Sequence, residues 1–137
     1  MDARDRQEMP YQVEVGEVFV LKYNGLPQDQ RQLIQAFVTH YRSHGLEGWR
    51  GKVAKTDNVP MSDPDRSHKI WWANRHNLWH AHVGHPHWSP GQNPYVKYET
   101  SDWVVHFQKV SAQLIALIDY DHHNPMSMPV RSMLYRS

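Results

Sequence analysis

The chain has 137 residues, about the size of one domain, and it contains no cysteine, which excludes disulfides, thiolate nucleophiles and cysteine-ligated zinc. The formal net charge is +1 with neutral histidines, so the chain is not the clearly basic domain that plain electrostatic binding of nucleic acid usually requires. No apolar run approaches the ~20 residues of a membrane-spanning helix, and the N-terminus lacks the apolar segment of a secretory signal. We therefore expect a single cytoplasmic domain over residues 1–137, without a membrane partner.

The first half of the chain predicts a tail, a strand, a helix and a long loop. We expect residues 1–10 to form a flexible tail. Polar and apolar residues alternate over 11–23, which predicts a strand with a bulge, or a tight start of two strands, near Gly16. The clearest helix is predicted over 25–45, where an apolar stripe recurs at helical spacing between a proline and a glycine. Glycine, proline and charged residues predict a long loop over 46–68.

The second half of the chain predicts adjacent strands. Strand-like runs occur at 69–73 leading into 78–84, at 95–110 with a turn near "ETSD" (99–102), and at 114–122, with a proline-rich loop at 85–94 between the first two. A short tail with one helical turn closes the chain. Consecutive strands joined by short turns are normally antiparallel, and the strands are not interleaved with helices. We therefore expect an α+β fold, with an antiparallel sheet of about four to five strands and one main helix packed on one face.

The most unusual segment is "LWHAHVGHPHW" (78–88), which holds four histidines among eleven residues. Successive side chains of a strand point to opposite faces. His80 and His82 therefore share one face, and the alternating apolar residues of the segment (Trp79, Ala81 and Val83) face the core. The following glycine and proline end the strand, which leaves His85 and His87 in a loop of unpredicted direction.

Further polar side chains are expected near this pair. In "WVVHFQKV" (103–110), the alternation places His106 on the face opposite the apolar residues, so it would join His80 and His82 if the two strands pair. The apolar run 114–118 changes abruptly into "DYDHH" (119–123), and such a strand exit commonly carries reactive side chains; here these are Asp121, His122 and His123.

Three chemical interpretations remain open. Two histidines at i and i+2 on one strand, completed by a third from a neighbour, can chelate a metal ion. Histidines can also act as acid and base in RNA cleavage without a metal, because their ordinary pKa lies near neutrality. The third interpretation is a non-catalytic interaction domain whose histidines are a tolerated surface.

The order of "KIWWANRHNLWHAHVGH", "YETSDWVVHFQ" and "LIALIDYDHHNPM" over the last ~70 residues resembles the YafO-type toxins of bacterial toxin–antitoxin modules, within the RelE-like mRNA interferases. The resemblance implies a RelE-like α+β toxin that cleaves mRNA on the ribosome without a cofactor or metal, inhibits translation and is itself inhibited by a cognate antitoxin. It implies catalytic roles for His80, His82, His106, Asp121, His122 and His123. On the RNA-cleavage interpretation, the expected RNA-binding residues are Lys109, Arg131, Tyr135, His85 and His87, of which Arg131 and Tyr135 loosely match C-terminal positions of the family.

Overall fold

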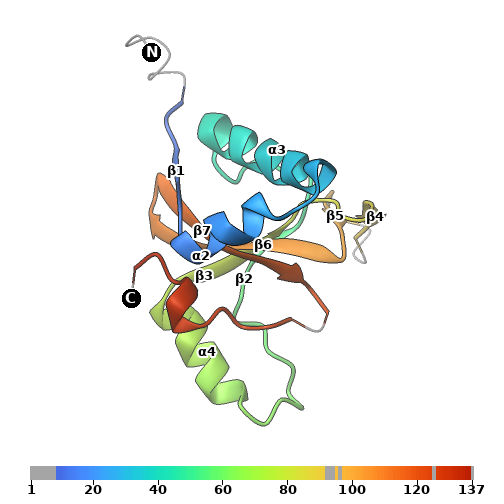
Figure 1. The fold of residues 1–137 in the computed structure, drawn as a ribbon. Helices are drawn as coiled ribbons and strands as arrows, with labels where there is room; N and C mark the ends of the chain where they lie inside the picture. Colours follow the sequence, from blue (N-terminus) through green and yellow to red (C-terminus); the bar gives the residue numbers. More distant parts are fainter. Residues whose placement is uncertain (1–8, 92–94, 96, 125, 137) are drawn as a thin grey trace.

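A five-stranded sheet organises the chain in the computed structural model, which describes residues 9–91, 95, 97–124 and 126–136 (Figure 1). The strand order is β1-β7-β6-β3-β2. The strands are β1 (Gln12–Val15), β2 (Val53–Lys55), β3 (Leu78–His82), β6 (Trp103–Ser111) and β7 (Leu114–His122). The predicted tail at 1–10 lies almost entirely outside the described residues.

The sheet is mixed, which corrects the expectation of an antiparallel sheet. β1 runs parallel to β7, with Gln12 opposite Leu114 and Val15 opposite Leu117. The other three pairs are antiparallel. The predicted α+β class is confirmed. The parallel pair arises because the first strand adds beside the last one, a long-range pairing that no turn between neighbours could reveal.

The helix predicted over 25–45 is confirmed as α3 (Gln28–His44). Proline fixes φ near the value of a helical start, and Pro27 stands just before the first turn. Gly45 ends the helix with φ of 68°, in the left-handed region that favours glycine. α3 buries Phe37 and Tyr41 against the sheet, which makes this face the main hydrophobic core.

The strand predicted over 11–23 is wrong beyond residue 15, because α2 (Glu17–Asn24) follows β1 directly. The β-branched and aromatic residues of this segment favour a strand locally. In the folded chain α2 packs on β7 and buries Phe19, so tertiary packing overrides the local preference.

Three other predictions about the middle of the chain need correction. The strand-like run at 69–73 belongs to α4 (Arg66–Arg75), and the loop at 46–68 contains β2. The loop at 85–94 contains β4 (Ser89–Pro90), which pairs with β5 (Glu99–Thr100). The turn predicted near "ETSD" is confirmed, because Ser101 and Asp102 separate β5 from β6. The strand at 114–122 is confirmed as β7, and a short helical turn, η1 (Arg131–Met133), lies near the C-terminus.

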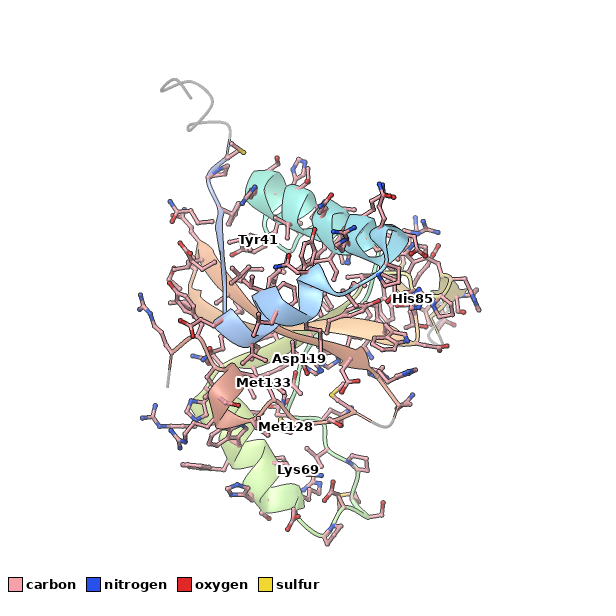
Figure 2. All side chains as sticks on the ribbon, viewed as in Figure 1. Tyr41, Lys69, His85, Asp119, Met128 and Met133 are labelled. Carbon is pink, nitrogen blue, oxygen red and sulfur yellow. The ribbon has the colours of Figure 1, made fainter. Side chains whose placement is uncertain are left out.

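The sheet has two unlike faces (Figure 1). α2 and α3 cover one face, and α4 with the C-terminal segment lies on the other. Figure 2 shows Tyr41 on the α3 side and Lys69 and Met128 on the α4 side. The second face has a smaller apolar cluster of Ala73, Leu78 and Ile118, which leaves room for polar side chains. Among the described residues, none of the helices is both long and apolar enough to cross a membrane.

Candidate functional site

β3 and β6 bring three of the predicted histidines to the α4 side of the sheet. Ala81 and Val83 enter the main core, so strand alternation turns His80 and His82 to the opposite face, as predicted. His106 lies directly opposite His80 in the β3–β6 register, and their ring centroids are 6.0 Å apart. All three histidines are buried.

His123 completes a cluster with the β3 pair. One ligand atom from each of His80, His82 and His123 lies within 4.8 Å of the others. The ring centroid of His123 is 5.4 Å from that of His80 and 4.7 Å from that of His82. Its backbone N–H donates to the carbonyl of Asp102 at 2.7 Å, which fixes this position just beyond the end of β7. The three imidazoles form what we call the histidine triad.

Hydrogen bonds orient two imidazoles of the histidine triad. Nδ1 of His80 lies 2.9 Å from the hydroxyl of Thr56, and Nδ1 of His82 lies 2.7 Å from the carbonyl oxygen of Ser101. The backbone N–H of Ser101 also donates to this Nδ1 at 3.0 Å, so the two contacts favour opposite tautomers of His82. In the tautomer that donates from Nδ1 to the carbonyl oxygen, Nε2 keeps a free lone pair. That Nε2 is buried and has no hydrogen-bond partner among the described residues. A second nitrogen bonded to a backbone carbonyl is the usual arrangement of a metal-binding histidine.

His106 lies beside the histidine triad without belonging to it. Its side chain is fully buried, and within the described part of the chain neither ring nitrogen has a hydrogen-bond partner. Asp119 stands opposite His106 in the β6–β7 register, but its carboxylate forms an ion pair with Lys22 at 2.8 Å. Two buried nitrogens without partners are costly, because their hydration is lost and nothing replaces it.

Burial keeps these imidazoles neutral. It lowers the pKa of His80 to about 2, with the neighbouring histidines and Lys52 adding to the effect. Burial also lowers the pKa of His82 and of His106 to about 4, and it lowers the pKa of His123. A neutral imidazole is the form that binds a metal ion. A histidine acting as a general acid near pH 7 instead needs a pKa close to neutrality.

Two cavities border the histidine triad. The larger, about 690 Å³, reaches His82 and His123, and the smaller, about 390 Å³, reaches His80 and His123. Lys52, His123 and Asn124 line both cavities. We call them the upper cavity and the lower cavity; the lower one extends to α4 through Lys69. A ligand on the triad is thus reachable from solvent.

The structure disperses the other predicted site residues. Exposed His122 contacts Trp103 in a tilted arrangement, with ring centroids 4.2 Å apart, instead of joining the histidine triad, although it lines the upper cavity. Half-buried Asp121 accepts a hydrogen bond from the backbone N–H of His122. His85 contacts the same tryptophan edge-on, and His87 is exposed in the loop.

The predicted RNA-binding residues outside that loop do not gather at the histidine triad. Lys109 lies over the ring of Trp79, which packs against the core on the α3 side. Arg131 lies over the ring of Trp72 on α4. Half-buried Tyr135 packs in the smaller apolar cluster, and its backbone N–H donates to the side chain of Gln108.

Sequence reasoning missed Thr56, Ser101 and Lys52, which contact or surround the histidine triad. Lys52 and Thr56 flank β2, in the segment predicted as a loop. The weak signal was the alternation in "KVAKT" (52–56), which places the lysine, alanine and threonine on one face. Ser101 acts through its backbone carbonyl, which any residue supplies, so no sequence signal marks it.

The chain matches no protein-family model, no curated protein sequence and no solved structure.

Proposed function

We propose that the histidine triad is a metal centre for a divalent transition-metal ion, of which Zn²⁺ fits best, and that the chain uses it for hydrolysis. The observation that carries this proposal is the convergence of three neutral imidazoles, two of them oriented through Nδ1. Three protein ligands with an open fourth position are typical of catalytic zinc. Such an ion supplies Lewis acidity and lowers the pKa of a bound water to about 7.

The ligand set and its spacing fit this ion. Zn–N bonds of about 2.0–2.1 Å in a tetrahedral site place ligand nitrogens roughly 3.4 Å apart. The ligand atoms of the triad lie within 4.8 Å of one another, so Zn²⁺ binding requires each ligand nitrogen to move about an ångström towards the ion. His123, at the end of its strand and half-buried, is the ligand with the most room to move.

Metal titration of the purified chain tests the proposal. We expect one Zn²⁺ or Co²⁺ per chain by calorimetry, and visible bands of tetrahedral Co²⁺. His82→Ala should weaken binding at least 100-fold, whereas His87→Ala, which removes an exposed loop histidine, should not change it. Equal binding by both variants, or no stoichiometric binding to the wild-type chain, would refute the metal centre.

Metal-free cleavage of RNA by a toxin of a toxin–antitoxin module is the second function that we propose, and one surface of α4 favours it. His68 stacks on Trp71 with ring centroids 5.8 Å apart, and 55% of Trp71 is exposed. The helix also carries Arg66, Lys69 and Arg75 and no acidic residue. Exposed aromatic rings among cations are typical of surfaces that stack single-stranded bases. The lower cavity joins this surface to the histidine triad through Lys69.

RNA cleavage is tested with chelator-treated protein and a labelled single-stranded RNA. The proposal expects cleavage without metal, with half-buried His123 as base or acid, and expects Trp71→Ala to weaken RNA binding about 5- to 100-fold. Leu21→Ala is the control, because Leu21 is also a large exposed apolar residue but lies on α2, on the other face. Intact RNA under these conditions would contradict this second function and leave the metal centre standing.

A further inference from the structure

We propose that Lys52 makes the upper cavity selective for ligands that carry an oxyanion group, a carboxylate or a phosphate, bound next to the open position of the metal centre. This inference rests on the proposed metal centre, and it adds the class of substrate. It follows from the position of Lys52, from its lack of a counter-charge and from the hydrogen-bond donors around it.

The backbone holds Lys52 firmly beside the histidine triad. Its N–H donates to the carbonyl of Glu99 at 2.8 Å, and its carbonyl accepts from the backbone N–H of His82 at 3.0 Å. Its side chain lines both cavities, and its ammonium lies 5.6 Å from the centroid of the Tyr98 ring. Lys52 thus borders both cavities that reach the histidine triad.

Lys52 is a cation without a carboxylate partner in the part of the chain that the structure describes. Three ion pairs are present there, Lys22–Asp119, Arg50–Glu99 and Lys69–Asp63, and none includes Lys52. Its charge is nevertheless close enough to lower the pKa of His80, His82 and His123. A lysine held beside imidazoles without a counter-ion creates a positive field at this site.

The charges around the metal centre leave this field uncompensated. Neutral imidazoles bring no negative charge, so a divalent ion and Lys52 together carry +3. Of the nearby carboxylates, Asp119 is paired with Lys22, and Asp121 accepts from the backbone N–H of His122 and lines neither cavity. Asp102 lines the upper cavity but is exposed to water, which screens its charge. An anionic group is therefore favoured beside Lys52, next to the open position.

The upper cavity also supplies donors for the other oxygens of such a group. Ser89, Tyr98, Thr100 and Asn124 line it, and each can donate a hydrogen bond. The volume of about 690 Å³ is within the usual size of small-molecule sites, so the oxyanion is one group of a larger ligand. The ammonium of Lys52 would bind the oxyanion group, and the metal centre would face the rest of the ligand.

The test uses the full chain loaded with Co²⁺, titrated in separate arms with acetate and with methylphosphonate, and followed by the visible spectrum of the metal. In the wild-type chain at least one anion should change the spectrum with saturation. The stronger arm identifies a carboxylate or a phosphate as the preferred group. Lys52→Gln should weaken that anion at least tenfold while Co²⁺ binds at least as tightly. Lys109→Gln, which removes a lysine on the α3 side, is the matched control and should behave as wild type.

The outcomes separate the two proposals. If Co²⁺ gives no site spectrum, the metal centre is refuted and the anion inference falls with it. If Co²⁺ binds normally but neither anion changes the spectrum, only the inference about Lys52 is refuted. The same holds if Lys52→Gln binds the anion as tightly as the wild-type chain does.

Discussion

The imidazoles of His80 and His106 face each other across the β3–β6 pair, 6.0 Å apart between ring centroids, and both are buried. Adding a proton to either ring places a charge in a poorly hydrated space beside other basic groups. The pair therefore couples the stability of the sheet to pH and to whatever ligand occupies the histidine triad.

Acid should destabilise the metal-free chain. The folded-state pKa values of His80, His82 and His106, about 2, 4 and 4, lie below the ordinary value near 6.5, so the unfolded state binds more protons between these limits. The free energy of unfolding is therefore highest above pH ~6.5 and falls as the pH drops towards 4. Each histidine contributes a decrease of about 1.4 kcal/mol per pH unit in this range.

Urea unfolding at several pH values measures this dependence. His106→Leu removes one of the three histidines and both of its unpartnered nitrogens, so its stability should fall less steeply between pH 6 and 4. Parallel curves for His106→Leu and the wild-type chain would contradict the proposed coupling.

Thr56 should tune the affinity of the histidine triad for metal. Thr56→Val keeps the shape of the side chain but removes the hydroxyl 2.9 Å from Nδ1 of His80. Loss of such a partner typically weakens metal binding 10- to 100-fold, because the ring loses its fixed tautomer and orientation. Calorimetric Zn²⁺ titration measures the change. Thr39→Val, an exposed change on α3, should leave the affinity unchanged, and equal affinities for both variants would count against the orienting role of Thr56.

Gly51 should be required for the close approach of the β2 segment to β3. A Cβ at this position would overlap the backbone oxygen of His82 and would lie 2.8 Å from the ring of Trp88. Gly51→Ala should therefore displace His82 and lower the melting temperature by several degrees, together with a loss of metal affinity. Gly25→Ala is the control, because an added Cβ there meets nothing closer than 3.6 Å. A melting temperature for Gly51→Ala equal to that of Gly25→Ala would show that the backbone adjusts freely.

Lys22 should stabilise the end of β7. Its ammonium pairs with the carboxylate of Asp119, whose side chain is 4% exposed, and also donates to the carbonyl of Tyr120 at 3.1 Å. Lys22→Met leaves that carboxylate unpaired, so we expect the free energy of unfolding to fall by about 1–3 kcal/mol. The loss stays modest because the side chain of Lys22 is 40% exposed to water, which weakens the ion pair. Denaturant unfolding should show no comparable loss for Lys97→Met, which changes an exposed lysine without an ion pair in the described structure.

Strand alternation predicted the parts of the site that lie within single strands. The period of two placed His80, His82 and His106 on one face, and it separated His85 and His87 from them. His123, and not His122, joins the histidine triad because of the direction that the chain takes at the end of β7. Strand alternation does not predict that direction. A register irregularity between β6 and β7 lies next to His106, and irregularities of this kind have no sequence signature in this segment.

The segments predicted wrongly are those in which tertiary contacts decide the structure. Residues 17–24 have strand-forming side chains but fold as a helix, in which Phe19 is buried in the main core. Residues 69–73 sit in α4, where Trp72 donates from its indole N–H to the carbonyl of Pro129 at 2.8 Å. Such partners are more than 50 positions away in the sequence, so local patterns could not include them.

The parallel pairing of β1 with β7 has a consequence for how the chain acquires its histidine triad. Val13 lies opposite Ile115, so an early segment can enter the sheet only after a segment about a hundred residues later has been made. Contacts between such distant segments slow folding, because the intervening chain must first be ordered. His123 follows that late strand directly, so the three imidazoles meet only after synthesis has passed residue 123. During synthesis, a chain that has not yet reached His123 would carry His80 and His82 of β3 but could not form the histidine triad.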